Sequence, residues 1–202
     1  MKRLALLPPL LLAFCTGAVS QGWAPSAAEE AKLLSVLGLV PGKKVGEIGA
    51  GEGQLSIRVA KAVGSEGRVF ATELAPLRDT LKKNMERAGV ANVEVVEART
   101  ASTGLEEGCC DAIVMRDVYH HITAPEEILV DIRRALRPAG RLLIIDFEPR
   151  TFLPAVGAEV RARAGLLPAA LLAADFGPLP VFALGLDVAF VVWRRVAGRF
   201  AV

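Results

Sequence analysis

Three glycines at alternate positions, Gly49, Gly51 and Gly53, separate a short apolar run from a second one, and a carboxylate, Glu47, precedes them. Glycine is favoured where the backbone takes a positive φ or where a ligand must lie against the main chain. A helix that begins after such a turn presents unpaired amide groups to that ligand. The stretch is therefore predicted to form a strand, a tight turn and a helix that bind a nucleotide-like molecule.

The charges and spacing of this loop argue against two common phosphate sites. It lacks the Gly-Lys-Ser/Thr ending of a Walker loop, and the dinucleotide pattern would need its third glycine at Gln54, one residue after Gly53. The carboxylates Glu47 and Glu52 would also repel a pyrophosphate. A nucleoside with a cationic or zwitterionic tail suits the loop better, and S-adenosylmethionine is the expected ligand.

Two further groups could do chemistry near such a ligand. Glu73 ends an apolar run twenty residues beyond Gly53, where a carboxylate can accept hydrogen bonds from ribose hydroxyls. His120 and His121, the chain's only histidines, follow another apolar run. Either histidine could act as a general base near neutral pH, and a role in packing or at a helix entry remains equally open. Asp117 could orient one of them or bind an ammonium group.

The elements that must position these residues alternate regularly along the chain. Apolar periodicity and turn residues predict helices and strands in strict alternation, which favours a parallel sheet with its ligand at the carboxyl ends of the strands. The last of these helices includes Leu136, and a break over 137–140 precedes the fifth strand. The predicted strands are 44–48, 68–73, 92–97, 111–115 and 141–147, and the helices run over about 26–37, 55–63, 76–88 and 123–136.

Over about 33–148 the sequence resembles the bacterial class I S-adenosylmethionine-dependent methyltransferases of the ubiquinone/menaquinone type. The resemblance rests on the glycine loop, on Glu73, and on segments 111–114, 118–121 and 136–142. It implies an α/β Rossmann-like fold: a mostly parallel seven-stranded sheet with an antiparallel last strand and helices on both faces. It also implies transfer of a methyl group from S-adenosylmethionine to a small-molecule acceptor.

By this resemblance the loop binds the methionine part of the cofactor, Glu73 binds the ribose, and the residues after the fourth strand lie near the methionine and the substrate entrance. Two residues depart from the family pattern: Arg99 stands where an acidic residue often lies near the adenine, and Ala139 replaces a common glycine. The predicted cofactor-binding residues are Glu47, Gly49, Ala50, Gly51, Gly53, Glu73, Leu74, Arg116 and Asp117.

Composition and the amino terminus set the remaining expectations. Hydrophobic residues make up 52% of the 202 residues and the net charge is only +2, so the chain is expected to be globular and not to bind nucleic acid. No cysteine or histidine spacing indicates a metal site. The adjacent Cys109 and Cys110 are not expected to bridge each other, because a disulfide needs more separation between the α-carbons, so no disulfide framework is predicted. The sequence does not indicate an oligomeric state.

Residues 1–20 have the basic start, apolar run and small residues of a secretory signal or membrane anchor, followed by a methyltransferase domain over 24–200. The protein is therefore expected to be exported, periplasmic or membrane-associated, although the cofactor is made in the cytoplasm, which is the alternative location. Two other functions stay open. One is a noncatalytic exported binding or scaffold protein with this fold, and the other is a nicotinamide-dependent oxidoreductase.

Overall fold

A computed structural model of the chain describes residues 27–147, 176–178, 182–183 and 188–195. The predicted signal or anchor segment over 1–20 and most of the proline-rich apolar run after residue 151 lie outside the described residues. So does Ser26, where the first predicted helix starts; in the structure that helix begins at Ala27. Among the described helices none is long and apolar enough to cross a membrane.

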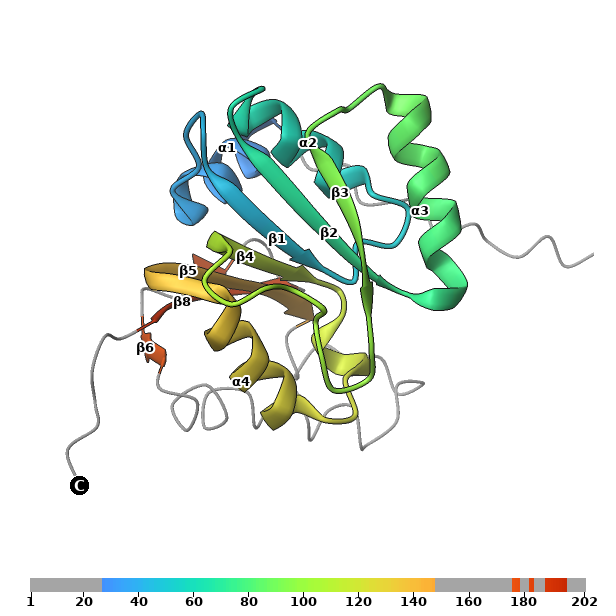
Figure 1. The fold of residues 1–202 in the computed structure, drawn as a ribbon. Helices are drawn as coiled ribbons and strands as arrows, with labels where there is room; N and C mark the ends of the chain where they lie inside the picture. The colour runs from blue at the N-terminus through green and yellow to red at the C-terminus, as the bar shows by residue number, and fades with distance from the viewer. Residues whose placement is uncertain (1–26, 148–175, 179–181, 184–187, 196–202) are drawn as a thin grey trace, which may run out of the picture.

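Strands and helices alternate as the sequence predicts, and the strands join one sheet (Figure 1). The helices are α1 (Ala27–Leu37), α2 (Gln54–Val63), α3 (Ala75–Ala88) and α4 (Pro125–Ala135), with a short 3-10 helix η1 (Tyr119–His121) before α4. The strands are β1 (Lys44–Ile48), β2 (Arg68–Leu74), β3 (Val93–Ala98), β4 (Cys110–Arg116), β5 (Leu136–Phe147), β6 (Phe176–Pro178), β7 (Phe182–Ala183) and β8 (Val188–Arg195).

The described strands follow the spatial order β3-β2-β1-β4-β5-β8-β6, with β7 also paired to β8. Strands β1 to β5 are parallel, whereas β8 runs antiparallel to β5 and pairs with it from Phe147–Val188 to Arg141–Arg194. The order reverses at β1, because β2 and β3 lie on one side of it and β4 and β5 on the other. In open parallel sheets such a reversal opens a crevice at the carboxyl ends of the strands.

Apolar side chains alternate between two cores because successive strand residues point to opposite faces. On one face α1, α2 and α3 cover the sheet, and on the other α4 packs against β4 and β5 (Figure 1). Val45 of β1 belongs to the first core and Ile48 to the second. The predicted arrangement of helices on both faces is confirmed.

The start of β5 differs from the prediction. Leu136 was expected on the preceding helix, but α4 ends at Ala135 and Leu136 already pairs with Cys110 of β4. The predicted break over 137–140 is an irregularity inside the strand, because the next paired residue is Arg141, opposite Ala112. Ala139, which replaces the family's glycine, takes a φ of 61° here, a conformation that costs an alanine about 1–2 kcal/mol.

The structure joins the sulfur atoms of Cys109 and Cys110. The expectation that adjacent cysteines stay unbridged is therefore wrong in this structure. The bond closes no loop between separate elements, so it does not cross-link the fold as a disulfide framework would.

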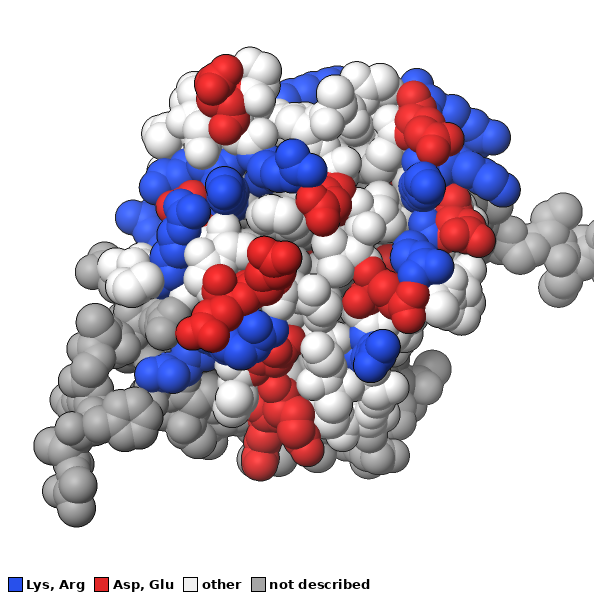
Figure 2. All heavy atoms as spheres, viewed as in Figure 1, with Lys and Arg blue, Asp and Glu red and all other residues white. Residues whose placement is uncertain are grey.

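Charged side chains of both signs are interspersed over the face drawn in Figure 2. On α3, at the right of that view, the sequence alternates acids and bases from Arg78 to Arg87. A surface of this kind is a solvated helix face and does not form a field of a single sign.

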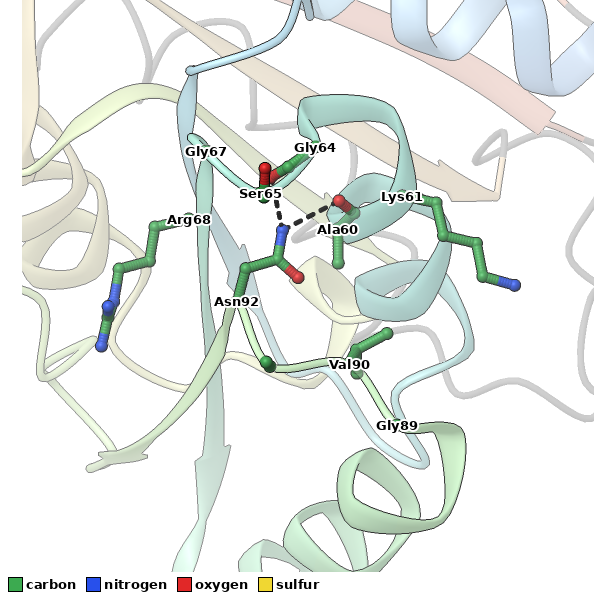
Figure 3. Close-up of a pocket in the computed structure, with 10 residues that line it drawn as sticks. Ala60, Lys61, Gly64, Ser65, Gly67, Arg68, Gly89, Val90 and Asn92 are labelled. Atoms are coloured by element: carbon green, nitrogen blue, oxygen red, sulfur yellow. Dashed lines mark hydrogen bonds between the residues drawn. The ribbon is translucent and has the colours of Figure 1, made fainter.

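A cavity of about 430 Å³ lies at the amino ends of β2 and β3, away from the glycine loop (Figure 3). In it the side chain of Asn92 points toward the end of α2 and donates hydrogen bonds of 2.9 Å to the carbonyl oxygens of Ala60 and Gly64. These bonds satisfy carbonyl groups that a helix end leaves unpaired. The side chain of Asn92 thus has a structural role, because it caps the carboxyl end of α2.

Candidate cofactor site

A second cavity, of about 480 Å³, lies at the carboxyl ends of β1 to β4, where the parallel sheet is expected to bind its ligand. Its wall is largely apolar and includes Ile48, Leu74, Leu77 and Ile128. Glu73, Arg99 and His121 bring charged or polar chemistry to it. The structure therefore brings Gly49, Glu73, Leu74 and His121, four of the residues predicted from the sequence, to one cavity.

The glycine loop turns sharply between β1 and α2. Gly49 has a φ of 66°, and a Cβ atom on it would lie 2.5 Å from a methyl carbon of Val118. Gly51 has a φ of 56°, and a Cβ there would meet no atom within 4 Å. The amide of Ala50 donates to the carbonyl of Thr72 at 3.0 Å, and the amide of Gly53 donates to that of Ala50 at 2.8 Å. Packing thus requires glycine at position 49, whereas Gly51 leaves open space beside its backbone.

Glu73 is buried at the end of β2 and ties that strand to the loop. One carboxylate oxygen accepts the amide of Gly51 at 2.7 Å, and the other accepts the amide of Leu74 at 2.8 Å. Each oxygen of an ionised carboxylate can accept a second hydrogen bond. Glu73 can therefore hold the loop and still receive two hydroxyl groups from a ligand in the cavity.

Glu47 lies beneath the loop and is not part of the cavity wall. It is 3% exposed, and the hydroxyl of Ser56 on α2 donates a hydrogen bond to it. Burial raises the pKa of Glu47 to about 7, and the charge of Glu73 adds to this effect, while the Ser56 bond and the charge of Arg116 oppose it. The loop therefore rests on a carboxyl group whose charge changes near neutral pH.

Arg116 ends β4 and Asp117 follows it, but neither residue lines the described cavity. The Nη1 atom of Arg116 lies 3.6 Å from the carboxylate oxygen Oδ2 of Asp117. Asp117 takes a φ of 54°, and its amide donates to the carbonyl of Ile145 at 2.9 Å. The pair lies at the carboxyl end of β4, beside β5. The positive charge of Arg116 lowers the pKa of Glu47 and so opposes the effect of burial.

The two predicted histidines lie in the short helix that precedes α4. Both belong to η1, and the exposed His121 lines the cavity beside Val118 and Ile122. The side chain of His120 lies outside what the structure describes. Among the described residues no three histidine, cysteine, aspartate or glutamate side chains gather as a metal-binding group.

Sequence reasoning missed an anchor that holds the loop after β3. Thr103, fully buried on the cavity wall, donates from its amide and its hydroxyl to Asp131 of α4, both at 2.7 Å. Arg134 bonds the other carboxylate oxygen of Asp131 at 2.8 Å and the carbonyl of Leu105 at 2.6 Å. These partners stand about thirty positions apart, so no local pattern could have revealed the contact.

Comparison with known proteins decides between the ligands left open by the loop. A family model described as a methyltransferase domain matches residues 46–144. The chain belongs to the class I S-adenosylmethionine-dependent methyltransferase family. The sequence prediction of this family is confirmed, and with it the sulfonium cofactor in preference to a nicotinamide dinucleotide.

The similar proteins agree on the fold. The chain is 30% identical over 122 residues to a ubiquinone/menaquinone biosynthesis C-methyltransferase of Cronobacter sakazakii, covering 58% of this chain and 47% of that protein. It thus spans about half the length of the curated relatives it matches. A crystal structure of a SAM-dependent methyltransferase from Aquifex aeolicus superposes with a TM-score of 0.75 at 23% identity, over 83% of this chain and 90% of that one. A cyclase superposes with a TM-score of 0.70 at 15% identity, over 85% and 81%.

The cavity of this methyltransferase-family chain fits the family's cofactor in three respects. The loop carries no lysine or arginine that would oppose a sulfonium or ammonium group. The backbone at Gly51 is open to close approach, and Glu73 keeps accepting capacity for a ribose. The exposed Leu74 and Leu77 offer an apolar surface to a flat ring.

Proposed function

We propose that the protein transfers a methyl group from S-adenosylmethionine to a small-molecule acceptor. The observation that supports this function best is the single cavity that joins Gly49, Glu73 and His121 at the switch point of the sheet. The family match supports the cofactor and the class of reaction. The acceptor is not assigned, because one fold hosts many chemistries, and a cyclase shares this one.

In this proposal the bound cofactor supplies the reactive methyl carbon, and the chain binds, orients and shields the reactants. Main-chain groups of the loop from Gly49 to Gly53 hold the methionine part, and Glu73 holds the ribose. Arg116 and Asp117 set the charge beside the methionine end. The apolar wall around Ile48 and Val118 keeps water from the reacting atoms.

His121 is the proposed base for an acceptor that is protonated at the working pH. Its imidazole borders the cavity and is exposed, so it can accept a proton from an acceptor and release it to solvent. His120 remains a second candidate from the sequence. An acceptor that is already a nucleophile would need no base, and His121 would then only position it.

Titration with S-adenosylmethionine and an assay with labelled methyl donor test the function. The acceptors to offer are small thiols, phenols, quinols and amines. Quinols are included because similar proteins are ubiquinone/menaquinone biosynthesis methyltransferases. We expect saturable binding and transfer to one class. The variant His121→Gln should lose about 10²-fold or more in turnover with unchanged cofactor affinity, if it is the base. Glu127→Gln, an exposed change on α4, is the matched control.

Two outcomes would replace this function. Absence of saturable cofactor binding would refute it outright. Binding without transfer to any acceptor would favour the noncatalytic binding or scaffold protein.

We also propose that the sheet corresponds to a seven-stranded family sheet ending in β8 and β6. A separate proposal is that the protein is exported or membrane-associated. The location rests on the basic and apolar residues of 1–20. Cell fractionation with a mass measurement of the mature amino terminus tests it, and a full-length cytoplasmic product would refute it.

A further inference from the structure

The cavity carries a cation on the side where the base of a nucleoside ligand would lie. With the glycine loop at the end of β1 and Glu73 at the end of β2, a ribose on Glu73 directs the base toward β3, the next strand in the sheet. Ala98 pairs with Leu74, and Arg99 comes directly after Ala98. Arg99 is thus the first residue beyond the paired ends of β2 and β3.

The guanidinium of Arg99 is available to a ligand. The side chain is exposed on the cavity wall and has no ion pair or hydrogen bond within the described part of the chain. Glu97, the nearest acid on β3, is paired with Arg78. The other charged group on this wall is Glu73, whose two oxygens bond the amides of Gly51 and Leu74.

The backbone around Arg99 is held in place. Its amide donates to the carbonyl of Ser102 at 2.8 Å, and the amide of Ser102 donates back at 3.2 Å. The next residue, Thr103, is bonded twice to Asp131 of α4. Arg99 therefore projects from a turn fixed at both ends, as a residue that selects a ligand should.

We propose that the guanidinium of Arg99 binds the purine base of the cofactor by donating hydrogen bonds to acceptor atoms on the edge of the base. A guanidinium carries donors only, so it cannot pair with the exocyclic amine of adenine and must bond a ring nitrogen. A purine with an oxygen at position 6 offers that oxygen and N7 together, the pair that arginine binds bidentately in guanine. The site should therefore accept a 6-oxopurine nucleoside at least as well as adenine. This inference rests on the proposed cofactor binding.

Titrations with S-adenosylhomocysteine and S-inosylhomocysteine, whose bases differ in the group at position 6 and in the proton on N1, test the proposal. We expect the wild-type protein to bind the inosyl ligand at least as tightly as the adenosyl one. Arg99→Asp replaces the donor by an acceptor. It should shift the ratio of the two dissociation constants by about tenfold or more in favour of the adenosyl ligand. Arg87→Asp, an exposed charge reversal on α3, should leave the ratio unchanged.

The outcomes separate the two proposals. If neither ligand binds the wild-type protein, the proposed cofactor function fails. If both bind and the ratio is the same in wild type and Arg99→Asp, the cofactor function stands and the role of Arg99 is refuted. A wild-type preference for the adenosyl ligand above tenfold would also refute it. Circular dichroism shows whether each variant is folded, and Arg99→Ala, which removes the donor without adding charge, gives an intermediate ratio if the proposal holds.

Discussion

The buried carboxyl of Glu47 makes the stability of the fold depend on pH in a defined direction. Its side chain lies under the glycine loop with the hydroxyl of Ser56 as its partner, and its pKa is raised to about 7 by burial. We predict that Glu47→Gln, which keeps an acceptor for Ser56 but cannot ionise, stabilises the free protein at neutral and alkaline pH and gains little at acid pH.

The sign and size follow from the proton balance of this one group. Between pH 4.5 and about pH 7 the folded carboxyl holds a proton that the unfolded chain has lost, so the free energy of unfolding falls as the pH rises. In the wild-type protein, the stability that this carboxyl contributes is complete below pH 4.5, where it is protonated in both states, and is gone above about pH 7. A pKa difference of this size corresponds to about 3 kcal/mol. For a chain of this length that is about 6–12 °C in melting temperature.

Thermal unfolding of wild type and Glu47→Gln between pH 5 and pH 8 measures the effect. The other carboxyls titrate alike in both proteins, so the difference between the two melting temperatures isolates Glu47. That difference should grow with pH, whereas for Glu66→Gln, an exposed acid, it should stay constant. A difference for Glu47→Gln that does not change across this range would show that the carboxyl is ionised in the folded protein and would refute the reasoning.

Two further predictions concern the backbone at the start of β5 and the anchor beside the cavity. Ala139→Gly should raise stability by about 1 kcal/mol, because glycine takes the positive φ of this exposed position without steric cost; an unchanged or lower melting temperature would contradict the strain. Asp131→Ala should lower the free energy of unfolding by about 1–3 kcal/mol, because it leaves the buried amide and hydroxyl of Thr103 unpaired. It should also weaken S-adenosylhomocysteine binding severalfold in titration. Asp79→Ala, an exposed change on α3, is the control, and equal affinities would exclude a role of the anchor in the site.

The parts of the fold set by local pattern could be predicted from the sequence. The alternation of strands and helices, the glycine turn and the position of Glu73 all follow from spacing within a few residues or within one unit of strand, turn and helix. Glu47 shows the limit of such reasoning. The sequence placed it in the loop motif correctly but could not show that it lies beneath the cavity wall with Ser56.

What the sequence could not show depends on contacts between distant segments. Leu136 fits the apolar face of a helix, and only its pairing with Cys110 places it in β5. The bonds from Thr103 to Asp131 join the loop after β3 to α4 beside the cavity. The position of His121 on the cavity wall likewise arises from the turn at η1, which periodicity does not describe.

The bond between Thr103 and Asp131 has a consequence for how this protein can be altered. Helix α4 carries Asp131, which fixes the turn of Arg99, and the same helix begins at Pro125, shortly after His121. Under the two proposals, α4 thus positions both the side of the cavity assigned to the nucleobase and the side assigned to the acceptor. Engineers or natural selection cannot shift α4 to admit a bulkier acceptor without also moving the wall that faces the nucleobase. Changes in acceptor range should therefore accumulate in side chains around His121, or in segments other than α4.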